Sequence, residues 1–482
     1  MNTVNDYLDN ILESLPGFLP EVVLSIGFLL LIIAEVFVKR PRLNAVLAFI
    51  TVLVSAFLIY QQLSDPQILF ANSIIVDRIS VYFRLIFAGT GLLFILFAEQ
   101  DTQLLQHRKG RGDLYPILIG ALLGMNILSM ASNLLLLFIG LEMVSLAGYI
   151  LAGFSANNRN QSEAAIKYAL FGGACSAAFL YGLSLIYGFA GSLQLNVTLI
   201  HQLTLLPLPL MVIIACLLVV GIGYKISLFP LHFWTPDVYE GTSTSIVAFL
   251  ATASKAAGFA LLIRLLVLLD ISGYQVTAGL AIVAIASMIF GHLAAIGQKN
   301  VKRMLAFSSI GNTGFLFLPL LWFSASGLQA FFAFLVIYVV GTYAAFTLTA
   351  YFEQRYGSTA IQSYAGLGRK EAFPAVLWVI VLVSLIGLPP TAGFFAKLLS
   401  FNVVLSAYQL SKDTLLLITL AIAVLTTVIS LYYYFKIPRE LFLKSSDEYL
   451  ASSQKFPLLL IIASILAALL LLFGIFPDFY SI

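Results

Sequence analysis

The chain has 482 residues, of which 61% are hydrophobic and 10% are charged, and its mean hydropathy is +1.02. A soluble domain is about 45–50% apolar and about a quarter charged, so charges this sparse could not cover a soluble surface. The formal net charge of +3 provides no basic field for nucleic acid. The two cysteines lie inside apolar runs, which argues against a disulfide framework and a zinc cluster. The composition therefore predicts a multi-pass membrane protein.

Fourteen apolar runs are long enough for helical spans, because about 20 residues cross a hydrocarbon core of about 30 Å. The runs are 19–38, 43–61, 79–98, 114–131, 133–154, 163–190, 207–234, 245–269, 275–297, 304–323, 327–352, 373–408, 414–435 and 456–476. A membrane β-barrel would instead show alternating segments of about ten residues. We therefore expect an all-α polytopic membrane fold with about 14 transmembrane helices.

The loop charges predict an orientation. If the N-terminus lies outside, nearly all loop Lys and Arg residues face inward, and only Arg78 and Lys412 face outward. Basic loops stay on the inner side of a membrane, so both termini are expected on the outer, periplasmic side. The first 18 residues contain no Lys or Arg, so no signal peptide is expected.

Two of the runs carry helix breakers. A straight helix over 373–408 would be about 54 Å long, at 1.5 Å per residue. Its middle, 387–393, reads Gly-Leu-Pro-Pro-Thr-Ala-Gly and cannot stay helical. The run 207–234 contains Gly221 and Pro230 near its inner end. Interrupted helices at corresponding places are typical of inverted repeats in transporters that bind ions near the membrane midplane.

This pattern predicts two inverted five-helix repeats, each with one broken helix. The expected parts are three N-terminal helices in 1–113, a first repeat in 114–270, a second repeat in 271–438 and a last helix in 439–482.

Four ionisable residues lie deep inside apolar runs: Glu142, Lys225, Lys255 and Lys397. Each unpaired charge at a helix centre costs about 2.5–3.5 kcal/mol, so pairing, hydration or neutralisation must relieve it. One interpretation is a structural ion pair such as Glu142 with Lys225, although one acid cannot neutralise three lysines. The other is a chain of protonatable sites. There, a carboxylate beside a lysine favours the ammonium, and its withdrawal favours release of the proton.

Other polar residues in the runs are more ambiguous. Lys167 lies a few residues into its run and could extend its ammonium to the inner surface. His232, near Lys225 at the inner end of its run, fits a proton-entry role and a loop role equally well. Arg84 and Arg264 lie near outer ends, where we expect interfacial anchors. His292 suits either a relay or a hydrogen-bonded interior histidine.

Sequence motifs for redox cofactors and nucleotides are missing. The sequence has no G-x-G-x-x-G after a strand, no Walker A loop, no C-x-x-C pair and no heme-attachment pattern. We therefore expect no site for NADH, flavin, ATP, an iron–sulfur cluster or heme in this chain, and no metal site. Uphill transport would take its energy from an ion gradient or from a partner.

Several stretches resemble the subunit N family of NADH-quinone oxidoreductase, the antiporter-like membrane subunits of respiratory complex I. They are 134–151 (LLLLFIGLEMVSLAGYIL), 163–188 (EAAIKYALFGGACSAAFLYGLSLIYG), 223–241 (GYKISLFPLHFWTPDVYEG), 298–314 (QKNVKRMLAFSSIGNTG) and 387–401 (GLPPTAGFFAKLLSF). The related M-type subunits have glutamate where this chain has Lys397, and the L-type subunits have a long C-terminal lateral helix. The resemblance is therefore to the N type.

The resemblance implies roles for individual residues. Glu142 matches the glutamate that modulates the lysine at Lys225. Lys255 matches a central lysine, and Lys397 matches the terminal one. Lys167 matches a lysine present in many members. These residues are expected to pass protons from the cytoplasm along a hydrated polar axis to the outer side, driven by redox chemistry in other subunits.

The resemblance also implies the surroundings of the chain. We expect a translocase subunit in the bacterial inner membrane, in contact with lipid and with M-type and small K/J-type subunits, and neither a stand-alone homo-oligomer nor a nucleic-acid-binding protein. FMN and iron–sulfur clusters would lie in other subunits, with NADH and quinone as substrates. Three alternatives remain: an Mrp-type cation/proton antiporter subunit, a membrane subunit of a related hydrogenase complex, and a subunit that only anchors and relays conformational change.

Overall fold

The computed structural model describes residues 4–106, 110–154, 159–195, 197–271, 277–445 and 456–476. The chain forms two compact units. The first unit contains Met1–Glu99, Gln103–Ile226 and Ala253–Tyr274, and the second contains Gln100–Thr102, Ser227–Thr252 and Gln275–Ile482. The chain therefore passes from the first unit to the second after Ile226, one residue beyond Lys225, and returns at Ala253, two residues before Lys255.

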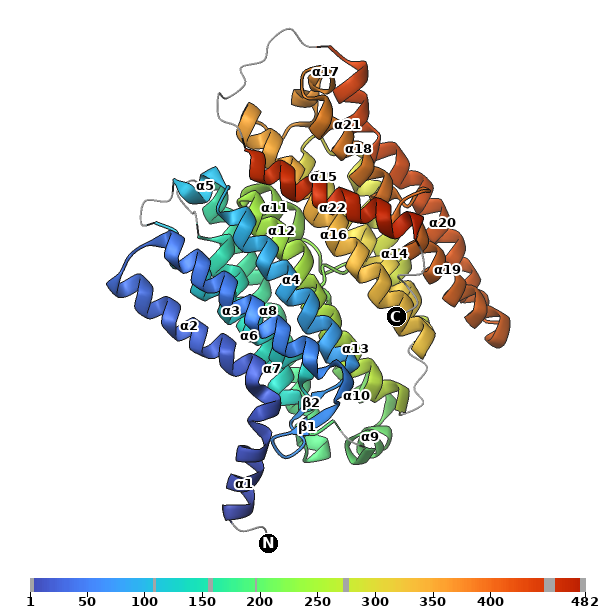
Figure 1. The fold of residues 1–482 in the computed structure, drawn as a ribbon. Helices are drawn as coiled ribbons and strands as arrows, with labels where there is room; N and C mark the ends of the chain where they lie inside the picture. The colour runs from blue at the N-terminus through green and yellow to red at the C-terminus, as the bar shows by residue number, and fades with distance from the viewer. Residues whose placement is uncertain are drawn as a thin grey trace. The chain divides into compact units, whose positions relative to one another are not determined.

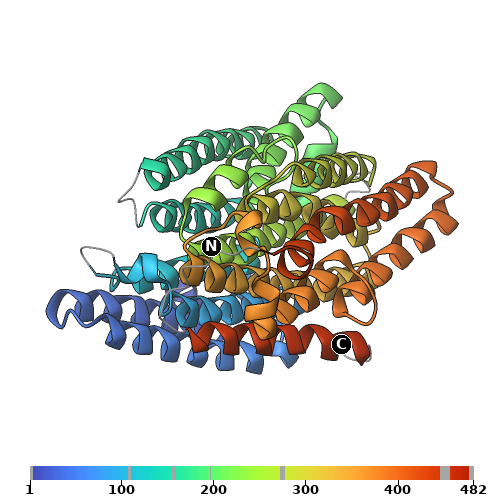
Figure 2. The same cartoon turned by 90° about the horizontal axis from the view of Figure 1, so that it is seen from above.

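The first unit is a helical bundle (Figures 1 and 2) with one short hairpin, β1 and β2 (Figure 1). Its elements are α1 (Val4–Ser14), α2 (Leu19–Phe37), α3 (Pro41–Gln61), β1 (Gln67–Leu69), β2 (Ile74–Val76), α4 (Arg78–Ala98), α6 (Leu114–Met130), α7 (Leu134–Ala152), α8 (Arg159–Ala190), α9 (Val197–Thr204), α10 (Leu208–Lys225) and α13 (Lys255–Ile271), with α5 (Thr102–Leu105) at the boundary. Helix α13 packs against α4, α6, α7 and α10, so it lies inside this bundle.

The second unit is also helical. Its elements are α11 (Trp234–Gly241), α12 (Thr244–Phe249), α14 (Thr277–Ile296), α15 (Val301–Phe317), α16 (Ala325–Tyr356), α17 (Leu367–Lys370), α18 (Ala372–Ile386), α19 (Ala392–Ser411), α20 (Thr414–Tyr434), α21 (Lys436–Pro438) and α22 (Pro457–Ile475). Helix α14 packs against α15 and α20, and α16 packs against α18, α19 and α22.

The predicted fold class is confirmed. Each of the fourteen predicted runs contains a helix. Within the described residues, 11 helical segments are long and apolar enough to cross a membrane, and α6 and α18 are shorter apolar helices. The prediction missed several short elements, among them α1, α5, α9 and the hairpin, because none of them forms a long apolar run.

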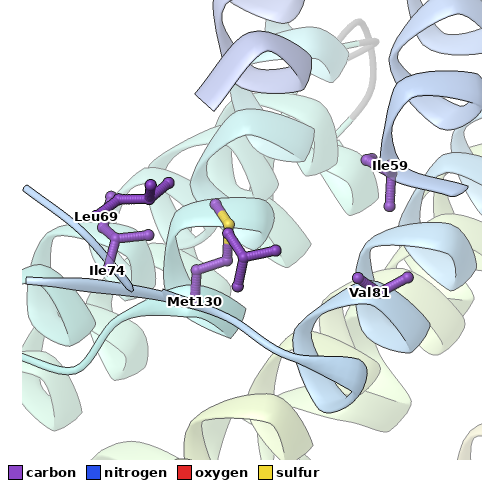
Figure 3. Close-up of a cluster of buried hydrophobic side chains, with 6 residues drawn as sticks. Ile59, Leu69, Ile74, Val81 and Met130 are labelled. Atoms are coloured by element: carbon purple, nitrogen blue, oxygen red, sulfur yellow. The ribbon is translucent and has the colours of Figure 1, made fainter. Parts of the chain in front are cut away.

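The hairpin closes one end of the first unit. Strands β1 and β2 are antiparallel, with Ile68 opposite Ile75. Leu69 and Ile74 pack with residues from the ends of α3, α4 and α6 in a buried apolar cluster (Figure 3). The cluster consists of Ile59, Leu69, Ile74, Val76, Val81 and Met130. It therefore joins the connections between three helices at the same end of the bundle.

The break in 373–408 lies where the breakers predict it. Helix α18 ends at Ile386, and Gly387 follows with φ +87°, in the left-handed region that favours glycine. The amides of Gly387 and Leu388 both donate to the Val383 carbonyl, at 3.0 and 3.1 Å. The Gly393 amide donates to Ser384 Oγ at 3.3 Å. These amides of the break therefore find acceptors within the segment itself, as irregular backbone at membrane depth requires.

The run 207–234 is also interrupted. Helix α10 ends at Lys225, and α11 begins at Trp234. Within the second unit, the Phe229 amide donates to Ser287 Oγ of α14 at 3.1 Å, and Thr235 Oγ1 donates to Ser227 Oγ at 2.8 Å. A side-chain hydroxyl thus accepts one backbone amide of the interrupted segment, and a second hydrogen bond joins side chains across it.

A third irregularity was not predicted. Residues Leu250–Ser254 form a π-helical segment between α12 and α13, directly before Lys255. Single π turns inside helices often occur at functional sites. Here the π-helical segment ends at the residue before Lys255.

Candidate functional site

Lys225 is the centre of the site in the first unit. It is the last residue of α10 and only 2% exposed. Its Nζ donates to Ser145 Oγ of α7 at 3.3 Å. On the other side lies α13, where a Cβ added at Gly258 would come within 3.2 Å of Lys225 Cγ. The absence of a side chain at position 258 leaves room for the aliphatic part of the lysine.

Glu142 lies one helical turn before Ser145 on α7, on the same face. Its carboxylate interacts electrostatically with Lys225. Its Oε1 is buried and has no hydrogen-bond partner among the described residues. A buried, unpaired polar atom costs about 1–3 kcal/mol. The site therefore combines a partly satisfied carboxylate with a lysine that is held by a neutral hydroxyl.

Lys255 adds a second buried ammonium to this unit. It begins α13, three residues before Gly258, and is 1% exposed. The structure thus brings three of the four predicted deep residues, Glu142, Lys225 and Lys255, into one bundle around α7, α10 and α13.

Lys397 lies in the second unit, on α19 just after the break. It is 4% exposed, and its Nζ donates to the Ile386 carbonyl at 2.8 Å and lies 3.5 Å from Thr427 Oγ1. The Ile386 carbonyl is at the C-terminal end of α18, where the helix dipole favours a cation. The ammonium also lies 4.2 Å from the centroid of the Phe315 ring, a cation–π distance.

Lys167 and His232 occupy different surroundings. The Lys167 side chain is 38% exposed and forms an ion pair with Glu163, one turn earlier on α8, at 2.9 Å. His232, shortly before the start of α11 in the second unit, is buried, and its ring packs on Phe229 and Phe290 with centroids 5.4 and 4.4 Å away. Its Nδ1 has no hydrogen-bond partner in the part of the chain that the structure describes.

Both arginines expected as interfacial anchors are buried and paired instead. Arg84 contacts Glu21 at 3.2 Å, and both side chains are fully buried. Arg264 makes two bonds of 2.8 Å to the carboxylate of Asp77 and a 2.7 Å bond to the Ser129 carbonyl. The anchor interpretation is therefore wrong, because the acids that pair with these arginines draw them into the bundle.

Some residues of the site were not singled out from the sequence. Ser145 and Gly258 determine how Lys225 is held. Three tyrosines lie close to it: Tyr224 donates to the Tyr168 carbonyl at 2.6 Å, and the Tyr168 ring meets Tyr149 edge-on at 4.9 Å. A tyrosine within an apolar run carries no signal that separates such a role from packing.

Among the described residues, no three His, Cys, Asp or Glu side chains come together as metal ligands. In the described residues, the site consists of buried protonatable side chains, and its lysines Lys225, Lys255 and Lys397 lie next to interruptions in helices.

Comparison with known proteins identifies the family. Residues 131–430 match the family described as NADH:quinone oxidoreductase/Mrp antiporter, transmembrane. The chain belongs to this family. It is a multi-pass membrane protein.

Relatives with family-level identity extend over almost the whole chain. NADH-quinone oxidoreductase subunit N from Chlorobium chlorochromatii is 35% identical over 95% of this chain and 92% of its own length. NAD(P)H-quinone oxidoreductase subunit 2 from a Synechococcus species is 36% identical over 91% of this chain and 82% of its own. The resemblance to the subunit N family is thereby confirmed.

Solved structures agree with this assignment. A chain of respiratory complex I from Thermus thermophilus with bound aureothin matches with a TM-score of 0.79 and 31% identity, covering 95% of this chain and 97% of that one. A chain of an archaeal membrane-bound sulfane sulfur reductase has a TM-score of 0.83 at 22% identity, over 97% and 96% of the two chains. A chain of the Mrp complex from a Dietzia species has 0.83 at 20%, over 97% and 95%. These last two likenesses concern the fold alone.

Proposed function

We propose that this chain is a proton-translocating membrane-arm subunit of an NADH-quinone oxidoreductase. The observation that carries the proposal is the buried Lys225, held by Ser145 and facing Glu142, in a chain that is 31–36% identical to complex I relatives over nearly its full length. Electron transfer takes place in other subunits, and this chain moves protons in response.

The chemistry follows from the geometry around Lys225. A carboxylate near a lysine favours its ammonium form, whereas the Ser145 hydroxyl carries no charge. If Glu142 moves toward or away from Lys225, the lysine retains or releases its proton. The unpaired Glu142 Oε1 supports this idea, because a carboxylate that is not fully hydrogen-bonded has less to lose when it moves. Lys255 and Lys397 serve as further proton sites, and Lys167 and His232 are candidates for the inner side.

The two interrupted helices support the proposed repeats. In this division, repeat one covers 114–270 with the break after Lys225, and repeat two covers 271–438 with the break before Lys397. Residues 1–113 supply three additional helices, and 439–482 supply the last one. A broken helix exposes polar helix ends at membrane depth, which is where a transporter binds its ion.

The surroundings belong to the same proposal. The chain would lie in a bacterial inner membrane with both termini on the periplasmic side. It would contact lipid and the M-type and K/J-type subunits. FMN and iron–sulfur clusters would be held by other subunits, which would use NADH and quinone as substrates.

Two other functions are less well supported. They are an Mrp-type antiporter subunit and a membrane subunit of a related hydrogenase complex. The chains of the Mrp complex and of the sulfane sulfur reductase share this fold, but they are only 20–22% identical to this chain. A subunit with a purely structural role would pair its buried charges. Arg84 and Arg264 have such pairs, whereas Lys225 donates its hydrogen bond to a neutral hydroxyl and has only an electrostatic interaction with Glu142.

The first experiment is purification of the tagged chain from its native membrane in mild detergent. Flavin, iron–sulfur absorbance and inhibitor-sensitive NADH:quinone reductase activity in the eluate would support the complex I assignment. An eluate that holds only membrane subunits and no redox centres would favour the antiporter alternative, which sodium-flux assays would then test.

Substitution of the lysines tests the mechanism. We expect Lys225→Ala and Lys397→Ala to leave assembly intact, measured as NADH oxidation by an artificial acceptor. Quinone-coupled turnover and proton uptake into vesicles should fall by at least ~10-fold. This is a conservative expectation, because a positioned proton-transfer group contributes ~10²–10⁴-fold to a rate. Lys412→Ala, at an exposed position after α19, is the control. Normal pumping by assembled Lys225→Ala complex would rule out the role of that residue.

A further inference from the structure

The last described helix of the chain, α22, has no role in the proposed function. It is the most apolar of the 11 candidate spans in the described residues, with a mean hydropathy of 3.1. Its buried face runs from Leu459 to Gly474 at the three- and four-residue spacing of one helical face, and it packs against α16, α18 and α19 (Figure 1). Since α18 and α19 are the two halves of the broken helix, α22 touches both sides of the break.

Gly474 is the point at which α22 meets the break itself. A Cβ added at Gly474 would lie within 2.6 Å of the Pro390 carbonyl oxygen and of the carbonyl carbon and Cα of Thr391. These are backbone atoms, so no side chain can turn away to make room. The helix ends two residues later, at its C-cap Phe476, so Gly474 does not occupy the position after the C-cap where glycine favours the end of a helix. The close approach to the break is therefore what requires a glycine at this position.

Hydrogen bonds tie this contact point into the rest of the break. Thr391 is 1% exposed, and its Oγ1 and its amide both donate to the Leu388 carbonyl, at 2.7 and 3.2 Å. On the other side, the Gly393 amide donates to Ser384 Oγ, and a Cβ at Gly393 would collide with the Ser384 carbonyl. The segment is therefore compact, and a displacement at Thr391 reaches the residues that end α18.

The end of α18 is also what holds Lys397. The lysine Nζ donates to the Ile386 carbonyl at 2.8 Å. A Cβ added at Gly387 would lie 2.8 Å from Lys397 Cδ, so the aliphatic part of the side chain lies against this glycine. Residues 387–390 therefore connect the carbonyl that Lys397 binds to the backbone that α22 contacts.

The break depends on such a neighbour for its conformation. Non-helical backbone at membrane depth is tolerated where protein covers it, and α22 supplies part of this cover. Real Cβ atoms essentially never lie closer than 3.0 Å to a neighbouring heavy atom, so a larger residue at position 474 would push α22 and the break apart by up to about 1 Å. A closely packed interior transmits such a displacement instead of absorbing it.

We propose that α22 positions the break for proton transfer, and that Gly474 is a positioning residue for Lys397. The contact at Gly474 fixes the backbone of Pro390 and Thr391. Through residues 387–390, that backbone fixes the Ile386 carbonyl, and the carbonyl sets where the lysine ammonium lies. The inference rests on the proposed function, since the position of this ammonium matters only if Lys397 takes up and releases protons.

The test uses the assembled complex with three variants and a matched control. Gly474→Ala adds one methyl group at the contact point, and Leu470→Ala loosens α22 one turn earlier on the same buried face. The control is Leu459→Ala, about 22 Å from Gly474 at 1.5 Å per residue, because both leucines are 0% exposed and lose the same atoms. Lys397→Ala is the third variant. Each is measured for its unfolding midpoint in sodium dodecyl sulfate, for quinone-coupled turnover normalised to NADH oxidation by an artificial acceptor, and for the pH dependence of that turnover.

We expect Gly474→Ala to lower the normalised turnover about 10-fold, because a misplacement of about 1 Å can cost up to ~10²-fold in rate. Leu470→Ala should change it in the same direction. In both variants the pH of half-maximal turnover should shift, because the carbonyl that binds the Lys397 ammonium moves. Leu459→Ala should lower the unfolding midpoint while its normalised turnover and its pH profile stay at wild type.

Wild-type turnover in Gly474→Ala, or a loss no larger than that of Leu459→Ala, would overturn the positioning role. A lower turnover without a shifted pH profile would also overturn it, because general loosening of the helices does not change how Lys397 is held. If Gly474→Ala does not assemble, Leu470→Ala decides by the same two measurements. Normal turnover in Lys397→Ala would instead refute the proposed function of that lysine, whereas low turnover there beside wild-type behaviour of Gly474→Ala would refute only the role of α22.

Discussion

Removing Arg84 tests the buried ion pair in the N-terminal helices. Arg84 of α4 donates to Glu21 Oε1 of α2 at 3.2 Å and to Gln62 Oε1 at 2.8 Å, and Asn126 of α6 donates to the same Glu21 oxygen at 3.0 Å. Arg84→Met would leave the Glu21 carboxylate buried with one neutral donor. Breaking a buried pair from one side costs about 3–5 kcal/mol.

A double variant separates the lost charge from the lost packing. In Glu21→Gln/Arg84→Met, the amide can still accept from Asn126, and no charge is buried. The remaining loss should not exceed the ~1–3 kcal/mol of an imperfectly paired polar group, so the double variant should be more stable than Arg84→Met. Arg78→Met, at the exposed first residue of the same helix, α4, should match wild type.

The assay is the yield of intact complex together with the midpoint of its unfolding in increasing sodium dodecyl sulfate. Arg84→Met should show the lowest midpoint, with the double variant between it and wild type. Equal midpoints for the single and double variants would show that the uncompensated carboxylate is not the cause, and the reasoning from burial would then be wrong.

Three further predictions concern other parts of the chain. Glu142→Gln should lower quinone-coupled turnover more than Glu142→Asp, because charge matters more than side-chain length; equal activities would contradict the electrostatic switch. Burial alone would raise the pKa of Asp77, but the bonds and charge of Arg264 outweigh it and hold that pKa below its ordinary value of 3.8. The stability that Asp77 adds is therefore present above pH ~4 and lost below it, so thermal scans should show an Asp77→Asn defect at neutral pH that disappears in acid. Gly291→Ala should disrupt the packing of α14 and reduce complex yield, because its Cβ would lie 2.3 Å from the Gly311 nitrogen; a normal yield would refute that close approach.

The long helices and their breaks could be predicted because each has a local cause. A membrane span requires an uninterrupted apolar run, and Gly387 and the prolines after it cannot continue a helix. The π-helical segment 250–254 has no such cause in its sequence, Leu-Ala-Thr-Ala-Ser, which would also fit a regular helix. Its conformation depends on the helices that surround it.

The candidate site was predictable in its charges but not in their partners. Glu142, Lys225 and Lys397 stand out because a charge deep in an apolar run is costly. The partner of Arg84 lies 63 positions away and that of Arg264 lies 187 positions away, and nothing local connects them. Ser145 was within reach of sequence reasoning, since it lies on the same helical face as Glu142.

Two apolar spans differ in how much of them is buried. Thr244–Val267 has a mean hydropathy of 2.0, and all 18 residues of its apolar window are buried. Thr414–Leu443 has a mean hydropathy of 2.5, but only 28% of its 18-residue apolar window is buried. Hydropathy alone does not separate them, yet they should tolerate opposite kinds of mutation. A lipid-facing helix accepts changes of volume as long as the new side chain is apolar. A helix surrounded by protein resists a change of one methyl group but keeps a threonine or a lysine where a neighbour satisfies it. Among relatives, substitutions in Thr414–Leu443 should therefore keep the side chains apolar while their size varies. Substitutions in Thr244–Val267 should keep side-chain size.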